Sequence, residues 1–298
     1  MGILDGKAGL VTGGGRGIGR GHCLELAAQG MAVVVNDVDG DEAQAVVDEI
    51  TAAGGTAAAS DDDIGTRAGC EALVERCASE FGRVDAVINN AGIVRDRTLL
   101  KMTDEEFDDV YRIHVKGTFW CGQAGALRMR DQGEGGSIVN TTSGAQMGNF
   151  GQTNYAGSKG AIASMTYTWA LELARLGIRV NAIAPSATTR MTAQARDPKT
   201  GKAADSGRFL DPQLNSPMVA YLCSDEGSWI TGQILAVGGD RLGITVQPRY
   251  GDTLLMPGGW DVDAIREKFR AAFRARLENF GLAKRPYPFY DGLAPRKD

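Results

Sequence analysis

The chain has 298 residues, of which 43% are hydrophobic and 23% are charged, and its formal net charge is −5. This length and balance are typical of a globular protein with one large α/β domain and an appendage. A nucleic-acid partner is not expected because Lys and Arg form no basic cluster, and no apolar run is long enough to span a membrane.

Short apolar runs alternate along the chain with longer helical patterns, such as residues 41–54. The runs are nearly continuous in apolar character, which is typical of parallel strands covered on both faces. Repeated strand–helix–strand units predict an α/β fold with a doubly wound parallel sheet of about seven strands and helices on both faces. The expected strands cover residues 8–12, 32–37, 56–60, 85–90, 136–142, 178–184 and 233–239.

Two regions break this rhythm. Residues 192–212 are polar and rich in turn formers, which predicts a mobile loop. We divide the chain into a domain of residues 1–240 and a C-terminal helical extension of residues 241–298, which covers substrate or contacts another subunit. The extension contains a helical pattern over residues 261–280. One face of that helix carries Ile265, Phe269, Ala272, Phe273 and Leu277.

A glycine-rich turn, TGGGRGIGRG (12–21), stands between the first expected strand and a helical pattern. Such a turn lets backbone N–H groups and the N-terminus of a helix approach a pyrophosphate. Gly13, Gly17 and Gly19 fall in the spacing T-G-x-x-x-G-x-G, although glycine-rich turns also serve plain packing. In this context the turn predicts a dinucleotide site.

Asp37 ends the second expected strand, 24 residues after Gly13. A carboxylate near that distance suits the ribose 2′-hydroxyl of NAD and repels the 2′-phosphate of NADP. Arg16, inside the turn, favours NADP instead, because a guanidinium pairs with phosphate. We expect NAD, because the repulsion between the Asp37 carboxylate and the 2′-phosphate of NADP costs more binding free energy than a flexible Arg16 contributes by pairing with that phosphate. The alternative is that Asp37 merely ends a strand.

Tyr155 and Lys159 stand four residues apart in NTTSGAQMGNFGQTNYAGSK (140–159), so they share one face of a helix. A free phenol has a pKa of about 10, too high for an efficient base near neutral pH. The lysine cation is expected to lower that pKa, so that Tyr155 exchanges a proton with a secondary alcohol. An isolated pair of this kind also occurs by accident on surface helices.

Five motifs, taken in order, resemble the short-chain dehydrogenase/reductase family over roughly residues 3–240. They are TGGGRGIG (12–19), DDDI (61–64), NNAG (89–92), the Tyr155–Lys159 pair and RVNAIAP (179–185). The resemblance implies a Rossmann-type fold, an oxidoreductase acting on CH–OH with a nicotinamide cofactor, and a homodimer or homotetramer. NNAGIVRDRTLLKMTDEEF and GNFGQTNY look like the (3R)-hydroxyacyl-CoA dehydrogenase part of peroxisomal multifunctional enzymes and bacterial relatives. That likeness implies a 3-hydroxyacyl-CoA or hydroxysteroid-like substrate.

The same resemblance places further residues at the cofactor. Asp63 and Ile64 would contact the adenine, Lys159 would hold the nicotinamide ribose, and Thr189 would lie near the carboxamide. The expected cofactor-binding residues are Gly13, Arg16, Gly17, Ile18, Gly19, Asp37, Asp63, Ile64, Asn90, Ala91, Gly92, Tyr155, Lys159 and Thr189.

A hydroxyl upstream of Tyr155 should polarise the substrate oxygen. The usual family spacing of thirteen residues before the tyrosine selects Thr142, whereas the strand pattern IVN-x-S-S selects Ser143. We favour Ser143, because a strand fixes geometry more firmly than a glycine-rich loop of variable length. Thr142 stays the alternative.

His114, in IHVKGTF (113–119), stands where many family members have an Asn that relays protons from the lysine through water. Imidazole both donates and accepts, so we predict that His114 joins this relay, although a lone His is more often a core residue. The family's Pro-Gly after the sixth strand is altered to Pro185-Ser186, which leaves the nicotinamide contacts there open.

These patterns favour an NAD-dependent dehydrogenase that interconverts a secondary alcohol and a ketone. An NADPH-dependent 3-oxoacyl reductase is one alternative, which Arg16 keeps open. A non-catalytic dinucleotide sensor on the same fold is the other.

The five cysteines form no C-x-x-C pair, so neither disulfides nor a metal site is expected. Scattered cysteines of this kind suit a reducing compartment. The N-terminal sequence MGILDGKAGLV has no leader pattern, and we therefore expect a cytoplasmic protein.

Overall fold

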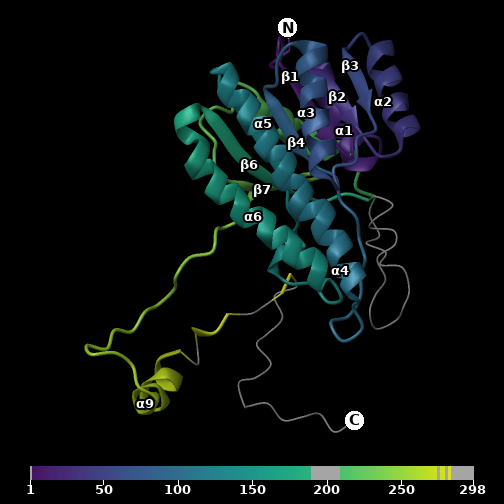
Figure 1. Ribbon diagram of the computed structural model, residues 1–298. Coiled ribbons are helices and arrows are strands. Elements are labelled where there is room, and N and C mark those ends of the chain that lie inside the picture. The colour runs from purple at the N-terminus through teal and green to yellow at the C-terminus, as the bar shows by residue number, and fades with distance from the viewer. Residues whose placement is uncertain (1, 189–208, 274–275, 279–280, 283–298) are drawn as a thin grey trace.

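A single eight-stranded sheet forms the centre of the computed structural model, which describes residues 2–188, 209–273, 276–278 and 281–282 (Figure 1). The strand order is β3-β2-β1-β4-β5-β6-β7-β8. Strands β1 to β7 pair in parallel, and β8 is antiparallel to β7. The strands are β1 (Ala8–Thr12), β2 (Ala32–Asn36), β3 (Ala57–Ser60), β4 (Ala86–Asn89), β5 (Gly136–Thr141), β6 (Ile178–Pro185), β7 (Ile234–Gly238) and β8 (Arg241–Ile244).

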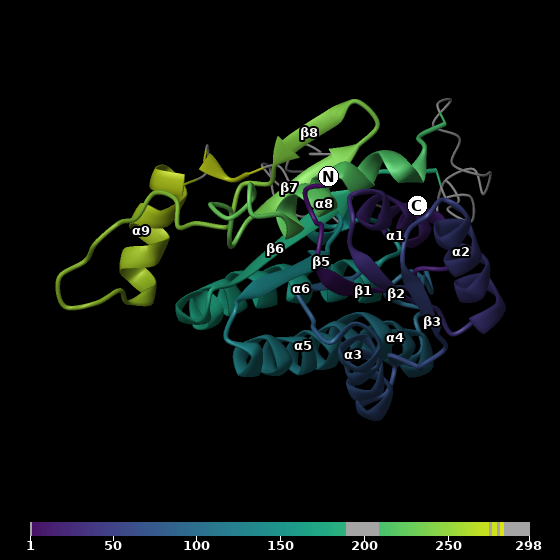
Figure 2. The same cartoon turned by 90° about the horizontal axis from the view of Figure 1, so that it is seen from above.

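Helices cover both faces of the sheet, with α1, α2 and α8 on one face and α3 to α6 on the other (Figure 2). The apolar runs are continuous because successive strand residues enter opposite cores. Val33 and Val35 pack with the first set of helices, and Val34 packs with the second. The helices are α1 (Gly17–Ala28), α2 (Gly40–Ala52), α3 (Arg67–Phe81), α4 (Asp104–Tyr111), α5 (Thr118–Gln132), α6 (Thr153–Leu173), α8 (Ser216–Cys223) and α9 (Val262–Phe273).

The predicted doubly wound fold is confirmed, and all seven expected strands are present within one residue at either end. Strand β8 was not expected, and it carries the sheet to Ile244, beyond the domain boundary placed at residue 240. The chain reverses at Gly238 and Gly239, whose φ values of 142° and 58° favour glycine. Because β8 is short and mostly exposed, it has no apolar run by which the sequence could reveal it.

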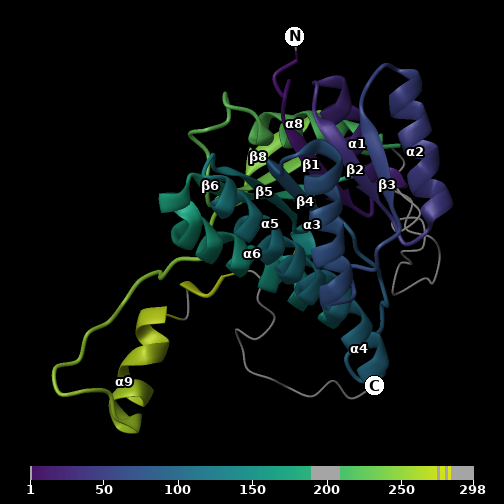
Figure 3. The ribbon, with the colours of Figure 1, turned by 45° about the horizontal axis from the view of Figure 1, so that its top comes forward.

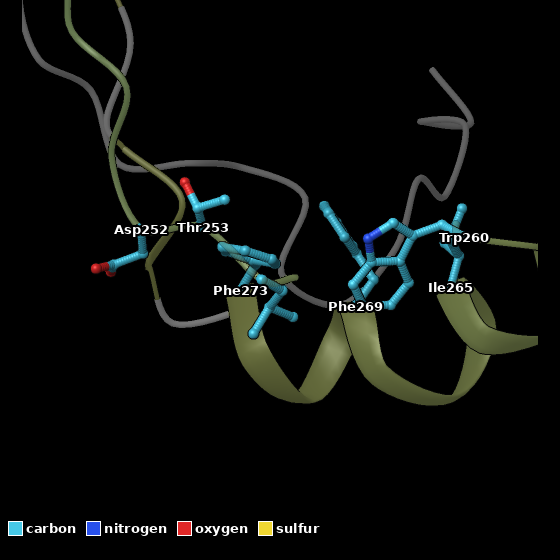
Figure 4. Close-up of a pocket in the computed structure, with 7 residues that line it drawn as sticks. Asp252, Thr253, Trp260, Ile265, Phe269 and Phe273 are labelled. Atoms are coloured by element: carbon cyan, nitrogen blue, oxygen red, sulfur yellow. The ribbon is translucent and has the colours of Figure 1, made fainter. Parts of the chain in front are cut away.

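Helix α9 of the extension lies apart from the sheet and its covering helices (Figure 3). Its described part is Val262–Phe273, and Leu277 and Glu278 are not helical, so it is shorter than the expected 261–280. Its apolar face lines a cavity together with a neighbouring segment of the extension itself. The cavity has a volume of about 450 Å³ and is lined by Leu254, Trp260, Ile265, Phe269 and Phe273, with Asp252 and Thr253 at one end (Figure 4).

Most of the expected loop, residues 192–208, lies outside the described residues, as does Thr189. All five cysteines are buried and unpaired. Among the helices of the described ranges, none combines the length and apolar character needed to cross a bilayer.

Candidate active site

The glycine-rich turn joins β1 to α1 as the sequence predicts. Gly13 and Gly17 have φ values of 63° and 55°, a region that favours glycine. A Cβ on Gly19 would clash with the Gly13 carbonyl oxygen, so only glycine allows this close approach. Helix α1 therefore begins tightly against the end of β1.

The N-terminus of α1 is open to an anion. Its N-cap residue, Arg16, makes no side-chain capping hydrogen bond, and the first turn contains no acidic residue. Uncapped N–H groups and the positive end of the helix dipole favour phosphate at such a position. These residues fit the pyrophosphate of a dinucleotide.

The end of β4 holds the turn in place. The side-chain amide of Asn90 donates to the carbonyl oxygens of Thr12 and Gly13 at 3.0 and 3.1 Å. In return, the Thr12 hydroxyl accepts the N–H groups of Asn90 and Ala91, both at 3.0 Å. The structure thus brings together the predicted Gly13, Asn90 and Ala91, and it shows that Thr12, to which the sequence assigned no role, connects them.

Three carboxylates lie between the end of β2 and the first turn of α2, namely Asp37, Asp39 and Glu42, and two of them form ion pairs with Arg16. The carboxylate of Asp37 accepts the N–H groups of Gly15 at 3.2 Å and Asp39 at 3.1 Å, which fixes it beside the turn. Arg16 forms ion pairs with Asp39 at 2.6 Å and Glu42 at 2.5 Å. The hydrogen bond to Glu42, and to a smaller extent the one to Asp39, raises the pKa of Arg16. Its charge is therefore already offset by two carboxylates, which the sequence analysis did not foresee.

The residues expected at the adenine differ in their exposure. The Asp63 carboxylate is half exposed and accepts the N–H of Gly65 at 2.8 Å. Ile64 is only 5% exposed, and its side chain packs against Gly117. A ligand at this edge would therefore meet Asp63 but little of the Ile64 side chain.

Helix α6 carries Tyr155 and Lys159 near its start, and Asn154 fixes that start. The Asn154 amide donates to the carbonyl oxygens of Arg95 at 3.0 Å and Glu106 at 2.9 Å. The side-chain amide oxygen (Oδ1) of Asn154 accepts the backbone N–H of Tyr155 at 2.8 Å. The first turn of the helix is thereby tied to α4 and to the segment after β4.

Of the two candidate hydroxyls, Ser143 is the one beside the phenol. A hydrogen bond from the Ser143 side chain lowers the pKa of Tyr155, although burial has the larger effect and raises it. The Ser143 hydroxyl oxygen also accepts the N–H of Ala145 at 3.1 Å. Thr142 is buried, and its hydroxyl donates to the Ile183 carbonyl on β6 at 2.9 Å. The strand therefore directs the two hydroxyls to different partners.

Lys159 is buried beneath the phenol. Its ammonium donates to the Thr141 carbonyl at 2.8 Å and lies 5.6 Å from the centroid of the Tyr155 ring. Burial lowers the pKa of Lys159 to about 7. For Tyr155, burial raises the pKa, the Ser143 hydrogen bond opposes this, and the Asp96 carboxylate adds to it. The net shift of the phenol pKa is therefore upward in the chain alone, opposite to the expected direction, because desolvation of the phenolate outweighs the Ser143 hydrogen bond.

His114 lies in a π-helical turn, Arg112–Gly117, between α4 and α5. Its Nε2 is 2.8 Å from the N–H nitrogen and 2.9 Å from the carbonyl oxygen of Ile93, and its Nδ1 is 3.3 Å from the Ser158 hydroxyl. That hydroxyl donates to the Tyr155 carbonyl at 2.8 Å. Burial is the main cause that lowers the His114 pKa well below its usual value, so the ring is neutral. These contacts position the Tyr155 helix, and the proton relay stays a prediction.

The ends of β1, β2, β4 and β5 meet at one edge of the sheet, where doubly wound folds bind their ligands. Fold and site together define a dinucleotide-binding oxidoreductase. The family described as short chain dehydrogenase matches residues 7–200. The chain belongs to this family, which confirms the resemblance drawn from its motifs.

Individual relatives agree with this membership. The chain is 42% identical over 243 residues to the short-chain reductase protein NovJ of Streptomyces niveus, covering 78% of this chain and 92% of that one. It is 37% identical over 249 residues to peroxisomal multifunctional enzyme type 2 of Mus musculus, covering 80% of this chain and 32% of that one. A solved 7α-hydroxysteroid dehydrogenase, complexed with NADH and 7-oxo glycochenodeoxycholic acid, superimposes with a TM-score of 0.73 at 36% identity, covering 80% and 94% of the chains.

Proposed function

We propose that the protein is an NAD-dependent dehydrogenase that interconverts a secondary alcohol and a ketone, with Tyr155 as its acid and base. The observation that carries the proposal is the juxtaposition of three groups: the Ser143 side chain beside the buried phenol of Tyr155, and Lys159 Nζ 5.6 Å from the centroid of the Tyr155 ring. Bound NAD would supply the acceptor for the hydride that leaves the alcohol carbon. Tyr155 removes the hydroxyl proton, Ser143 holds the substrate oxygen, and Lys159 holds the nicotinamide ribose.

The raised pKa of Tyr155 explains why this site would work only when loaded. Burial keeps the phenol protonated in the chain alone. Added positive charge, from a protonated Lys159 and from oxidised nicotinamide, favours the phenolate and brings its pKa toward neutral pH. In ketone reduction the neutral phenol is already the proton donor that is needed.

The hydroxyl assignment predicts a clear difference between two neighbouring substitutions. Ser143→Ala is expected to lower kcat by roughly 10²–10³-fold, because it removes the hydroxyl that stabilises charge on the substrate oxygen. Thr142→Val is expected to leave kcat within a few-fold, because its hydroxyl bonds to β6. Steady-state kinetics of both variants would check this. The reverse order of effects would assign the role to Thr142.

The preference for NAD is supported by the fixed Asp37 carboxylate and by the two ion pairs of Arg16. Asp37→Ser is expected to reduce the ratio of kcat/KM for NAD⁺ over NADP⁺ by roughly 10- to 100-fold, since a hydrogen bond to a charged group is lost and a phosphate is no longer repelled. Asp41→Ser, an exposed change on the same segment, is the matched control. An unchanged ratio for Asp37→Ser would rule out this role.

For the substrate we propose a 3-hydroxyacyl-CoA or a hydroxysteroid-like alcohol, which the similarity to the mouse multifunctional enzyme and to the 7α-hydroxysteroid dehydrogenase supports. A panel of secondary alcohols and 3-hydroxyacyl-CoA thioesters, assayed with NAD⁺ and NADP⁺ at the absorbance band of the reduced cofactor, tests the function. Binding of NADH without turnover of any compound would instead indicate a non-catalytic sensor.

We also propose a homodimer or homotetramer located in the cytoplasm. The five buried, unpaired thiols support a reducing compartment. Light scattering on the purified chain would measure the oligomeric state, and a monomer would refute the proposed homodimer or homotetramer.

A further inference from the structure

The C-terminal extension returns to the candidate active site at Gly281 and Leu282. The backbone N–H of Leu282 donates to the Gly148 carbonyl at 2.7 Å. A Cβ placed on Gly144 would lie 2.9 Å from Leu282 Cδ1, and one on Gly148 would lie 3.5 Å from the Gly281 Cα. The end of the extension therefore packs on the loop directly after Ser143.

This contact lies on the same turn that orients the Ser143 hydroxyl. Ser143 is the N-cap of the 3₁₀ turn Gly144–Met147. Above Gly144, the methyl group of Met147 lies 3.9 Å from the same Cβ position that Leu282 approaches. Leu282 remains 46% exposed and Met147 41% exposed. Two apolar side chains from distant parts of the chain thus share one partly open surface beside the hydroxyl.

The charge near the phenol complements this surface. Asp96 is close enough to Tyr155 for its carboxylate to raise the pKa of the phenol. The Asp96 carboxylate is held by Gln152, whose side-chain amide donates to it at 2.9 Å. A fixed negative charge disfavours an anionic group next to the reacting carbon.

We propose that Leu282 and Met147 form an apolar wall of the substrate site and select alcohols with a neutral, apolar substituent on the carbinol carbon. This inference rests on the proposed function, and it narrows the substrate class. Chains such as a thioester-linked acyl group or a ring system fit the wall, whereas a free carboxylate beside the carbinol does not. The extension is then part of the specificity of the enzyme.

A chain-length series tests the wall. The parent, Leu282→Ser and Leu255→Ser are assayed with 2-butanol, 2-hexanol and 2-octanol; Leu255 is 87% exposed on the same extension and serves as the matched control. Leu282→Ser is expected to lower kcat/KM for 2-octanol by roughly tenfold through KM, and to change 2-butanol less than about threefold. The control should match the parent. Equal chain-length dependence in Leu282→Ser and parent would overturn the proposal, as would faster turnover of free 3-hydroxybutyrate than of 2-octanol.

Hydrogen exchange supplies a readout that does not need activity. Amides of residues 143–150 are expected to exchange faster in Leu282→Ser than in the parent or Leu255→Ser, because the turn loses its cover. Unchanged exchange would overturn the contact on which the wall depends. A parent that oxidises neither an alcohol of this series nor any 3-hydroxyacyl-CoA thioester of the panel above, with NAD⁺ or NADP⁺, would refute the proposed function. Hydrogen exchange would still decide whether the extension packs on the turn.

Discussion

Tyr155→Phe is expected to lower kcat by roughly 10²–10⁴-fold, because it removes the one hydroxyl that exchanges a proton with the substrate. The ring itself remains, with its edge contact to His114 at a centroid distance of 5.4 Å. The substitution therefore tests chemistry rather than packing. Steady-state turnover of the best alcohol from the substrate panel is the measurement, with NADH binding followed by fluorescence to show that the cofactor site is intact.

Tyr167→Phe provides the matched control for this result. Tyr167 lies on the same helix α6, is half-buried, and has a pKa that burial also raises. Loss of its hydroxyl is expected to leave kcat within about twofold of the parent, because surface-directed changes away from the site have small effects. Equal turnover by Tyr155→Phe and the parent would show that the proton passes through another group.

Lys159→Met is expected to lower kcat for alcohol oxidation by roughly 10²-fold or more, because it removes the cation that favours the phenolate. Methionine keeps a similar length and fills the buried space. The kcat for alcohol oxidation should fall more than the kcat for ketone reduction, since reduction uses the phenol in its protonated form. Comparing the two directions at one pH is the measurement. Equal kcat values for variant and parent in oxidation would show that Lys159 does not assist the proton transfer.

The same substitution is expected to change how stability depends on pH. Burial lowers the pKa of Lys159 from 10.5 to about 7. Between these values the unfolded chain binds a proton that the folded chain lacks, so the stability of the parent rises with pH in that window. From pH 7 to 9.5 the rise is about 3 kcal/mol, and Lys159→Met lacks it. Urea unfolding without cofactor at both pH values measures the difference. If the free energy of unfolding changes equally with pH in the parent and in Lys159→Met, the lowered pKa of the buried lysine is contradicted.

The fold was predictable because its strands are marked by apolar runs that alternate with helices. Val33, Val34 and Val35 enter opposite cores in turn, so a doubly covered strand appears as a continuous run. Strand β8 has no such signal, because its residues are mostly exposed. The π-helical turn that holds His114 was also not predictable, since it depends on contacts with Ile93 and Ser158 that only the folded chain supplies.

The candidate site was predictable in its residues but not in its electrostatics. Spacing and motifs identified Tyr155, Lys159 and Ser143, which the structure brings together. Spacing alone does not reveal burial, and burial reverses the expected direction of the Tyr155 pKa shift. The ion pairs of Arg16 and the contact of Leu282 with the Ser143 loop join segments that are distant in sequence, so they required the fold.

The central claim is that the buried phenol of Tyr155 becomes an effective base only when positive charge is added beside it. The most direct measurement is a tyrosinate absorbance titration of the parent minus that of Tyr155→Phe, with and without NAD⁺. We expect the difference signal to titrate above the usual tyrosine range without NAD⁺ and more than one pH unit lower with it. The same midpoint in both titrations would contradict the claim.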